Sequence, residues 1–561
     1  MIFSQHAGGL RLALAAALLA GVARGERLFI GVLEADGYQT VLFGASAFSR
    51  VADLPLALEL VNKGLNTSFL VPSFSCVSPS ETFRVVQTVD PSQPRGDGNP
   101  ANVAILPILG NEASVHKVFE SAYAVRRNAP PVTWYEQPKS TNDAPRVALA
   151  IAGRHLMTSE SQGALEWAWE NRSKLIDAPP QSIPGMLRIL VNPQRFADLL
   201  GARSEQASDL FNLDKLLRDL DTFSFSITMD GQAFALAARG LPKAGSAVDT
   251  LSKALRPPLP KFWNGVPDDP FFCSVSACDT PRAWEAFLGR SAGHLLRPEG
   301  DLFPSGALSG DRLSYLASAA GKRGLCWVRI EPVKTAEPIR EAIRRLHTVK
   351  SLEGVSLSHE PARKKGELEI ETYSLKFQQP ASDAQSQPRA SEASTFFTLT
   401  TLFLKQAVLE ATVAEGHLVM VLGLPRSIDD QLESLLFRER TLPLQRKIVA
   451  QDPALSEKLC QGGSLQPAAL LRQIVELMPG VKPEHLRAFP HGGDGLTFGI
   501  SQGGDQTFTA SLRVQSSEIA ALQKINRDGR EVLQELVFQL FSNQMLHMQD
   551  AAAKDGAESA P

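Results

Sequence analysis

The chain lacks the short motifs that mark several common classes of enzyme. No H-E-x-x-H pair is present, and "SAAGKRG" (318–324) lacks the spacing of a phosphate-binding loop, so we predict no metal site and no cofactor. The formal charge is -3, and Lys and Arg form no cluster that could neutralise a phosphate backbone. Nucleic-acid binding is therefore not expected.

Long hydrophobic runs are also missing beyond the N-terminus, so we expect no membrane span in the mature chain. At the N-terminus, Arg11 precedes an apolar run (12–22), and the small residues Ala23 and Gly25 follow it. This pattern is typical of a secretory signal peptide spanning 1–25. We expect a periplasmic or secreted protein after cleavage near Gly25, with an uncleaved membrane anchor as the alternative.

Cysteine is scarce for a chain of 561 residues. The five cysteines leave at least one unpaired within a monomer, even in the oxidising compartment that export predicts. Cys273 and Cys278 lie in one expected strand, where their odd spacing sends the two side chains to opposite faces. We interpret both as small buried residues.

What the sequence does contain is three blocks that recur in the same order. "VALAIAGRHLMTSESQGALEWAW" (147–169) is similar to "LEATVAEGHLVMVLGLPRSIDDQLESL" (409–435), with His155 aligned on His417 at an offset of 262. "LVNPQRFADLL" is similar to "SLQPAALLRQI", and "FSFSITMDGQAFALAARG" to "LTFGISQGGDQTFTASLRV", at offsets of 273 or 274. The shared order and spacing predict an internal duplication.

Strand and helix periodicities alternate within each half. In one expected helix, Ile339, Ile343 and Leu346 form an apolar stripe. The length suggests two to four domains, and we predict an α+β fold of two tandem homologous repeats. Each repeat should be a mostly antiparallel sheet of hairpins with amphipathic helices packed on it.

The expected domain boundaries follow the composition. The first repeat should span 26–260 and the second 268–530, with the Pro-rich "LRPPLPKFWNGVPDDP" (255–270) as a linker. The polar segment 378–395 predicts a disordered loop, and the C-terminal residues 550–561 a disordered tail. Before that tail, the apolar spacing predicts a helix over 531–549.

The stretch "HGGDGLTFGISQGG" (491–504) contains two pieces of a serine hydrolase, an HGG and a G-x-S-x-G centred on Ser501. A nucleophile elbow needs a helix after the serine and oxyanion donors from a distant loop. Here the HGG lies close by, and an alternating strand pattern follows. Because Ser501 also aligns with Thr228, we predict a strand and a hairpin turn, and no catalytic residue.

Four residues are possible ligand contacts. His155 and His417 occupy equivalent places in the two repeats, although each can serve a structural role at the start of a strand. Trp167 and Trp169 lie two residues apart in an expected helix, so at least one should be exposed or line a groove. Such a tryptophan could stack on a sugar or contact a peptide.

The leader, the duplicated halves, "VALAIAGRHLMTSESQGALEW" and "LRILVNPQRFADLLG" together resemble uncharacterised exported bacterial proteins of the domain-of-unknown-function type. The resemblance implies export and two tandem α+β repeats, and it carries no catalytic motif. We expect a non-enzymatic binding protein or envelope-associated scaffold, whose partner is a protein or an apolar or small-molecule ligand. The alternatives are a hydrolase-type enzyme with scattered catalytic residues and a homo-oligomeric assembly module.

Overall fold

The computed structural model describes residues 31–536 with gaps, of which the longest are 54–68, 90–99, 137–145, 202–212, 278–302 and 378–406. The expected leader, the loop 378–395 and the tail 550–561 lie outside the described residues. The chain forms antiparallel sheet covered by helices, which confirms the expected α+β class.

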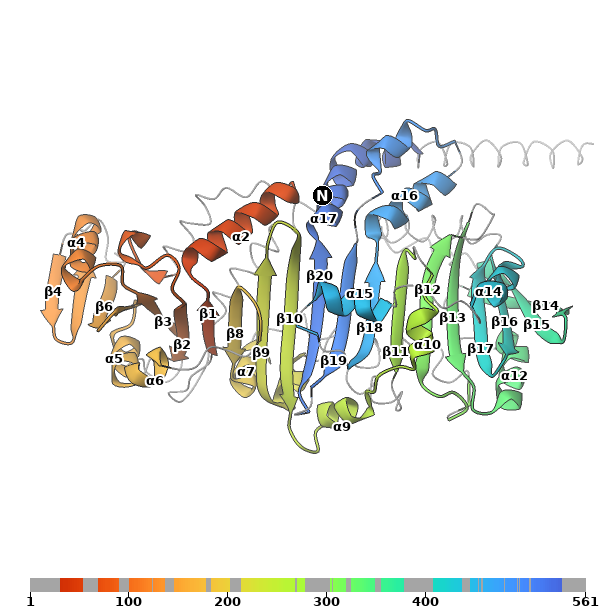
Figure 1. Ribbon diagram of the computed structural model, residues 1–561, viewed down its shortest axis with the longest axis horizontal. Helices are drawn as coiled ribbons and strands as arrows, with labels where there is room; N and C mark the ends of the chain where they lie inside the picture. Colours follow the sequence, from red (N-terminus) through yellow and green to blue (C-terminus); the bar gives the residue numbers. More distant parts are fainter. Residues whose placement is uncertain are drawn as a thin grey trace, which may run out of the picture. The chain divides into compact units, whose positions relative to one another are not determined.

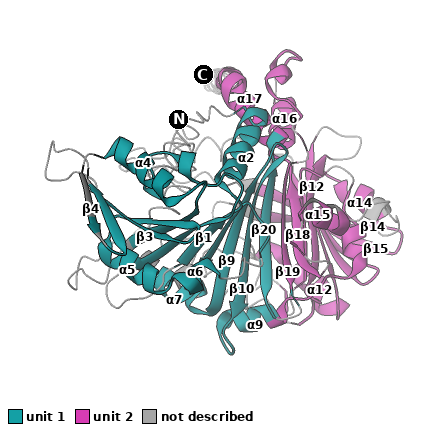
Figure 2. Cartoon of the chain, turned by 60° about the vertical axis from the view of Figure 1, so that its left-hand side comes forward, with its two compact units in different colours: residues 1–252, 503–516 teal, residues 253–502, 517–561 magenta. Residues whose placement is uncertain are grey.

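The chain divides into two compact units that are not contiguous in sequence (Figure 2). Unit 1 consists of 1–252 and 503–516, and unit 2 of 253–502 and 517–561. Residues 503–516, expected in the second repeat, therefore belong to unit 1. Local periodicity cannot indicate this, because it identifies a strand and not the strand with which it pairs.

Unit 1 is built on one antiparallel sheet, part of which is visible in Figure 1 as the neighbouring strands β1, β8, β9 and β10. In their order across the sheet, the strands are β4 (Val125–Ala129), β5 (Val132–Glu136), β6 (Arg146–Ala152), β7 (His155–Ser159), β3 (Pro100–Pro107), β2 (Phe83–Val89), β1 (Gly31–Ala35), β8 (Leu187–Val191), β9 (Leu220–Met229), β10 (Ala233–Pro242) and β20 (Phe508–Gln515).

Helices cover both faces of this sheet. The helices are α2 (Tyr38–Val51), α4 (Glu112–Ala122), α5 (Gln162–Glu170), α6 (Arg172–Ile176), α7 (Pro193–Gly201), α8 (Leu213–Arg218) and α9 (Ala247–Ala254), the last of which continues into unit 2. Helix α5 packs on the face that contains Ile105 and Met157. Helix α2 packs on the opposite face, where Phe48 meets Phe234 at a ring-centroid distance of 6.0 Å.

Unit 2 has an antiparallel sheet with the strands in a corresponding order. They are β14 (Val355–Lys365), β15 (Leu368–Phe377), β16 (Val408–Ala414), β17 (His417–Gly423), β13 (Leu325–Pro332), β12 (Asp311–Ser318), β11 (Phe272–Ala277), β18 (Leu459–Leu465) and β19 (Leu496–Gln502). Each of these strands corresponds to the strand of unit 1 whose number is lower by ten, from β1 and β11 to β9 and β19. With that correspondence, the strand order of unit 2 is the same as that of β1 to β9 in unit 1.

Two hydrophobic clusters of unit 2 lie one on each side of its sheet, and a third joins α16 and α17. The helices are α10 (Pro260–Asn264), α12 (Ala336–Arg344), α14 (Ser427–Leu435), α15 (Leu444–Gln451), α16 (Pro467–Leu477) and α17 (Ser516–Lys524). Helix α12 buries Ile339 and Ile343, and Leu346 follows in the same cluster, which confirms the stripe expected there. Helices α10, α14 and α15 contribute to the other cluster.

The predicted Pro-rich linker (255–270) contains ordered and buried structure. Helix α10 begins at Pro260, where the fixed φ of proline suits the first turn and no hydrogen bond is lost. Phe262 and Trp263 are buried in the core of unit 2.

At the other end of the chain, helical structure runs from α17 through a π-helical turn (525–529) to residue 536. The apolar positions of the expected C-terminal helix beyond residue 536 lie outside the described residues.

The hairpins that carry His155 and His417 match in register. His155 lies opposite Ala152 and Pro107, and His417 lies opposite Ala414 and Pro332. Each hairpin has a two-residue loop with φ of 46° to 73° at Gly153, Glu415 and Gly416, as tight hairpins require.

The stretch that contains Ser501 also has the expected form. Strand β19 ends at Gln502, β20 begins at Phe508, and the Gly503 N–H donates to the carbonyl of Thr507 at 2.7 Å. A strand therefore follows the serine. Among the described residues, no helix is long and apolar enough to span a membrane.

Candidate functional site

The two expected histidines are half-buried at the starts of β7 and β17. His417 donates from Nδ1 to the Glu415 carbonyl at 2.8 Å and accepts at Nε2 from Lys261 at 2.9 Å. Burial, and then Lys261, lower the pKa of His417, and burial likewise lowers the pKa of His155. Both rings are therefore neutral at neutral pH, and the contacts of His417 hold a turn together.

The two expected tryptophans both pack against the core of unit 1 through α5. Trp167 and Trp169 are both half-buried, and the expectation that at least one is exposed or lines a groove stays a prediction. The buried stripe of α5 is formed by small residues and one leucine, so the two large rings on either side of it both reach the sheet. The Arg172 guanidinium covers Trp169 at 4.6 Å from its ring centroid.

Ser501 does not lie on a nucleophile elbow, because it is within β19 and a second strand follows it. Ser501 is 2% exposed and lies within β19. The N–H of Gly493 donates to the carboxylate of Glu518 at 3.2 Å, and the same carboxylate accepts from the N–H of Ala468 at 2.7 Å. Burial raises the pKa of Glu518 despite these donors. The Gly493 N–H of the HGG stretch thus holds a side chain of this protein.

Buried charge within the strands is the feature that the sequence interpretation missed. In unit 1, Glu34 lies directly between Arg84 and Arg188 on three neighbouring strands. Its two carboxylate oxygens accept from Nε of Arg84 at 3.1 Å and from Nε of Arg188 at 2.9 Å. We call these three residues the first triad.

The first triad is closed by further contacts inside unit 1. Arg84 donates from Nη1 to the carbonyls of Leu175 and Ile176, both at 2.7 Å, at the end of α6. Arg188 donates to the Gly185 carbonyl and, from Nη2, to Asp36 at 2.5 Å. Two positive and two negative charges therefore balance within the cluster.

Unit 2 contains a second triad of Arg312, Glu331 and Arg329 on β12 and β13. Glu331 is 2% exposed and accepts at Oε1 from Arg312 and from Nη2 of Arg329, the latter at 2.9 Å. Burial alone would raise the pKa of Glu331, but the two guanidinium groups outweigh it and lower the pKa below its ordinary value. Glu331 is therefore ionised at neutral pH.

The triads occupy opposite sheet faces, as the pairing registers show. When the two sheets are aligned so that His155 corresponds to His417, each residue of the first triad has a counterpart in unit 2. Arg84, Glu34 and Arg188 correspond to Leu313, Val275 and Gly462, which are buried apolar residues and a glycine. The second triad falls on buried apolar positions of unit 1: Phe83, Leu106 and Ala104. Each unit therefore accommodates apolar residues where the other has charge.

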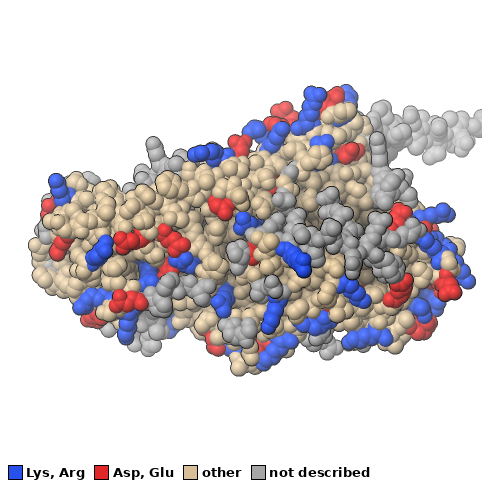
Figure 3. Space-filling model, in the orientation of Figure 1, with Lys and Arg blue, Asp and Glu red and all other residues tan. Residues whose placement is uncertain are grey.

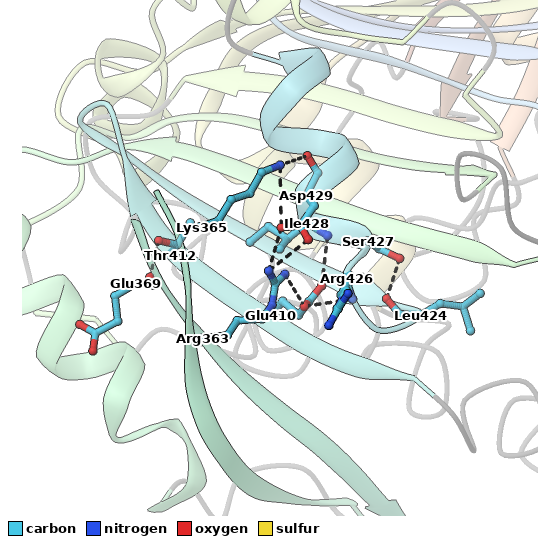
Figure 4. Close-up of polar contacts among 10 residues, drawn as sticks. All are labelled: Arg363, Lys365, Glu369, Glu410, Thr412, Leu424, Arg426, Ser427, Ile428 and Asp429. Atoms are coloured by element: carbon cyan, nitrogen blue, oxygen red, sulfur yellow. Dashed lines mark hydrogen bonds and ion pairs between the residues drawn. The ribbon is translucent and has the colours of Figure 1, made fainter. Parts of the chain in front are cut away.

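Two other polar clusters stabilise unit 2. The carboxylate of Glu410 on β16 accepts from Arg363 and from the N–H groups of Arg426 and Ile428 at the start of α14, at 2.9 to 3.1 Å (Figure 4). His359 contacts Glu371 at 2.7 Å through Nε2. Glu410 fixes α14 against the sheet, since a carboxylate suits the positive end of a helix. Within the described part of the chain, no three His, Cys, Asp or Glu side chains could hold a metal ion.

The surface charge is mixed in sign. Acidic and basic side chains are interspersed over the face shown in Figure 3.

A comparison of the chain with protein families, with curated proteins and with solved structures finds no match to any of them.

Proposed function

We propose that this chain is a non-enzymatic, exported binding protein built from two homologous α+β repeats. The observation that carries this proposal is the position of the buried charged residues. Where one unit has a charged triad, the corresponding positions of the other unit are apolar or glycine. In support of this, the positions of unit 2 that correspond in strand register to the first triad include the buried apolar residues Leu313 and Val275. Those of unit 1 that correspond to the second triad include the buried apolar residues Phe83 and Leu106. Removing charged groups from water is costly, so a buried triad that the fold does not need favours a specialised role.

The homology of the repeats rests on agreement between sequence and strand pairing. The sequence offset of 262 aligns His155 with His417, and those residues have matching partners in their sheets. Further along, Arg188 corresponds to Gly462 by register, at the offset of 274 that the second sequence block requires. Independent agreement at two offsets favours duplication. Superposition of the two units in an experimental structure tests it, and a different strand order in either unit would overturn it.

Binding is favoured over catalysis by the state of the buried acids. A general acid or base must be able to exchange a proton with a substrate. Glu34, Glu331 and Glu410 instead accept hydrogen bonds from arginine or from backbone N–H groups. These contacts favour a role in which the carboxylates orient other groups.

Export is compatible with the thiols of the described residues. Cys76, Cys273, Cys326 and Cys460 are buried and unbridged. Burial raises the pKa of Cys326 and of Cys460 to about 11, so both remain thiols that react slowly.

The intact mass of the exported protein tests the proposed leader. The proposal predicts a chain that begins at Glu26, and an exported chain of full length would contradict it.

Ester hydrolysis separates this proposal from the hydrolase alternative. We expect the purified full chain to hydrolyse p-nitrophenyl esters no faster than buffer does, and Ser501→Ala to change nothing. Turnover that Ser501→Ala abolishes would overturn the non-enzymatic assignment. Light scattering on the same sample reports whether the chain is a homo-oligomer.

A further inference from the structure

The second triad continues as a polar row across the sheet of unit 2. Ser276 on β11 lies directly opposite Arg312 on β12 and directly opposite Gln461 on β18. Residues that lie directly opposite each other project from the same face. Arg312, Ser276 and Gln461 thus form one row, which we call the polar row, with Glu331 and Arg329 at its end.

The Arg312 guanidinium is anchored at one edge and open at the other. Its Nε donates to the buried Glu331 carboxylate, whereas Nη1 and Nη2 have no hydrogen-bond partner in the part of the chain that the structure describes. The side chain is 19% exposed. In the first triad, by contrast, Nη2 of Arg188 donates to Asp36 and Nη1 donates to Gly185. The second triad therefore presents a fixed guanidinium edge that the first triad does not.

The other end of the polar row carries a buried acceptor without a donor. Oε1 of Gln461 is buried and accepts no hydrogen bond within the described structure. An unsatisfied buried polar atom is destabilising and rare, so it calls for an explanation. Ser276, between Gln461 and Arg312, is half-buried and adds a hydroxyl group to the same face.

The fold does not require polar side chains in this row. The corresponding positions of unit 1 are Phe83, Ala35 and Leu187, which pair in the same register and are all buried. Adjacent strands lie about 4.8 Å apart, so the backbones that carry Arg312 and Gln461 are about 10 Å apart. That span suits a small molecule with a polar group at each end.

We propose that the polar row binds a small organic carboxylate that also carries a hydroxyl or amino group. The paired Nη atoms of Arg312 match the two oxygens of a carboxylate in a planar, bidentate contact. Oε1 of Gln461 accepts the hydrogen bond of the hydroxyl or ammonium group at the far end. The inference rests on the proposed binding function and gives it a ligand class.

Calorimetric titration of the full chain tests the assignment with four probes: butyrate, 4-hydroxybutyrate, 4-aminobutyrate and inorganic phosphate. We expect 4-hydroxybutyrate or 4-aminobutyrate to bind about tenfold more tightly than butyrate, because only they satisfy Gln461. Phosphate shares the chemistry that Arg312 recognises but has no carbon chain that carries a second polar group toward Gln461. Tighter binding of phosphate than of every carboxylate would overturn the assignment.

Two variants locate the binding. Gln461→Leu installs the residue type of unit 1 and should remove the preference over butyrate while leaving butyrate binding unchanged. Arg312→Lys keeps the charge and loses the fork, so it should weaken all three carboxylates. Arg345→Lys, at an exposed position on the α12 side of the unit, is the matched control and should change nothing. Circular dichroism verifies that each variant is folded.

Failure of this proposal is distinguishable from failure of the proposed function. If none of the carboxylates binds, or if neither Gln461→Leu nor Arg312→Lys affects binding, the ligand assignment is wrong. The broader binding function fails on a different result, ester turnover that depends on Ser501.

Discussion

Removal of Glu34 should destabilise unit 1 far more than removal of the whole first triad. Glu34 is 1% exposed, and the side chains of its partners Arg84 and Arg188 are 13% and 11% exposed. The single substitution Glu34→Val leaves two largely buried guanidinium groups without their shared carboxylate. Breaking a buried ion pair in this way lowers the free energy of unfolding by about 3–5 kcal/mol.

The triple variant Glu34→Val, Arg84→Leu, Arg188→Leu tests the reasoning behind that number. It makes the row apolar, as Leu313 and Val275 do at two of the three positions in unit 2, and leaves Asp36, whose side chain is 46% exposed, able to be hydrated. Replacing a complete buried ion cluster with apolar residues is often neutral or stabilising by about 1–4 kcal/mol. We therefore expect the triple variant to be more stable than Glu34→Val alone.

Native-state hydrogen exchange on peptides from β1 and β8 measures the effect locally, which avoids assuming that two units unfold together. The control Glu81→Val removes an exposed pair with Arg154, at 3.5 Å, and should cost about 0–1 kcal/mol. If β1 and β8 of the triple variant exchange hydrogen as fast as those of Glu34→Val, or faster, the claim that apolar residues can replace the first triad is refuted.

Three further predictions concern pH, strand pairing and thiols. The folded-state pKa of Glu331 is lowered, so its contribution to stability is present above the unfolded pKa near 4.5 and is lost as the pH falls through the folded pKa. Glu331→Gln should therefore flatten that part of a plot of unfolding free energy against pH. An unchanged slope would contradict the assignment. Leu512→Pro in β20, opposite Leu236 of β10, should speed hydrogen exchange in β10 but not in β13, and equal effects on both would show that β20 does not belong to unit 1. Peptide mapping after iodoacetamide at pH 8 should find Cys326 and Cys460 unmodified in the native chain and modified in urea, whereas rapid native alkylation would show that the thiols are accessible.

The sequence predicted the features that depend on local pattern. The stripe of Ile339, Ile343 and Leu346 identified α12 because a helix brings residues three and four apart onto one face. The alternation after Ser501 likewise identified a strand where a catalytic elbow would need a helix.

The sequence did not predict the features that depend on partners far along the chain. The pairing of β20 with β10 joins residues more than 260 positions apart, as the contact between Arg239 and Thr507 illustrates. A charged residue in a strand pattern, such as Arg188 in "LRILV", is usually interpreted as facing solvent. Only the neighbouring strands and the helices on both faces reveal that it is buried, and a charge at an inward position is the signal to seek.

The most direct test of the account compares the two triads in one titration. 4-Hydroxybutyrate is titrated into the full chain and into Arg312→Lys and Arg188→Lys variants, which alter the open and the closed triad respectively. The account predicts saturable binding by the unmodified chain that Arg312→Lys weakens and Arg188→Lys leaves intact. Equal loss in both variants, or no loss in Arg312→Lys, would contradict it.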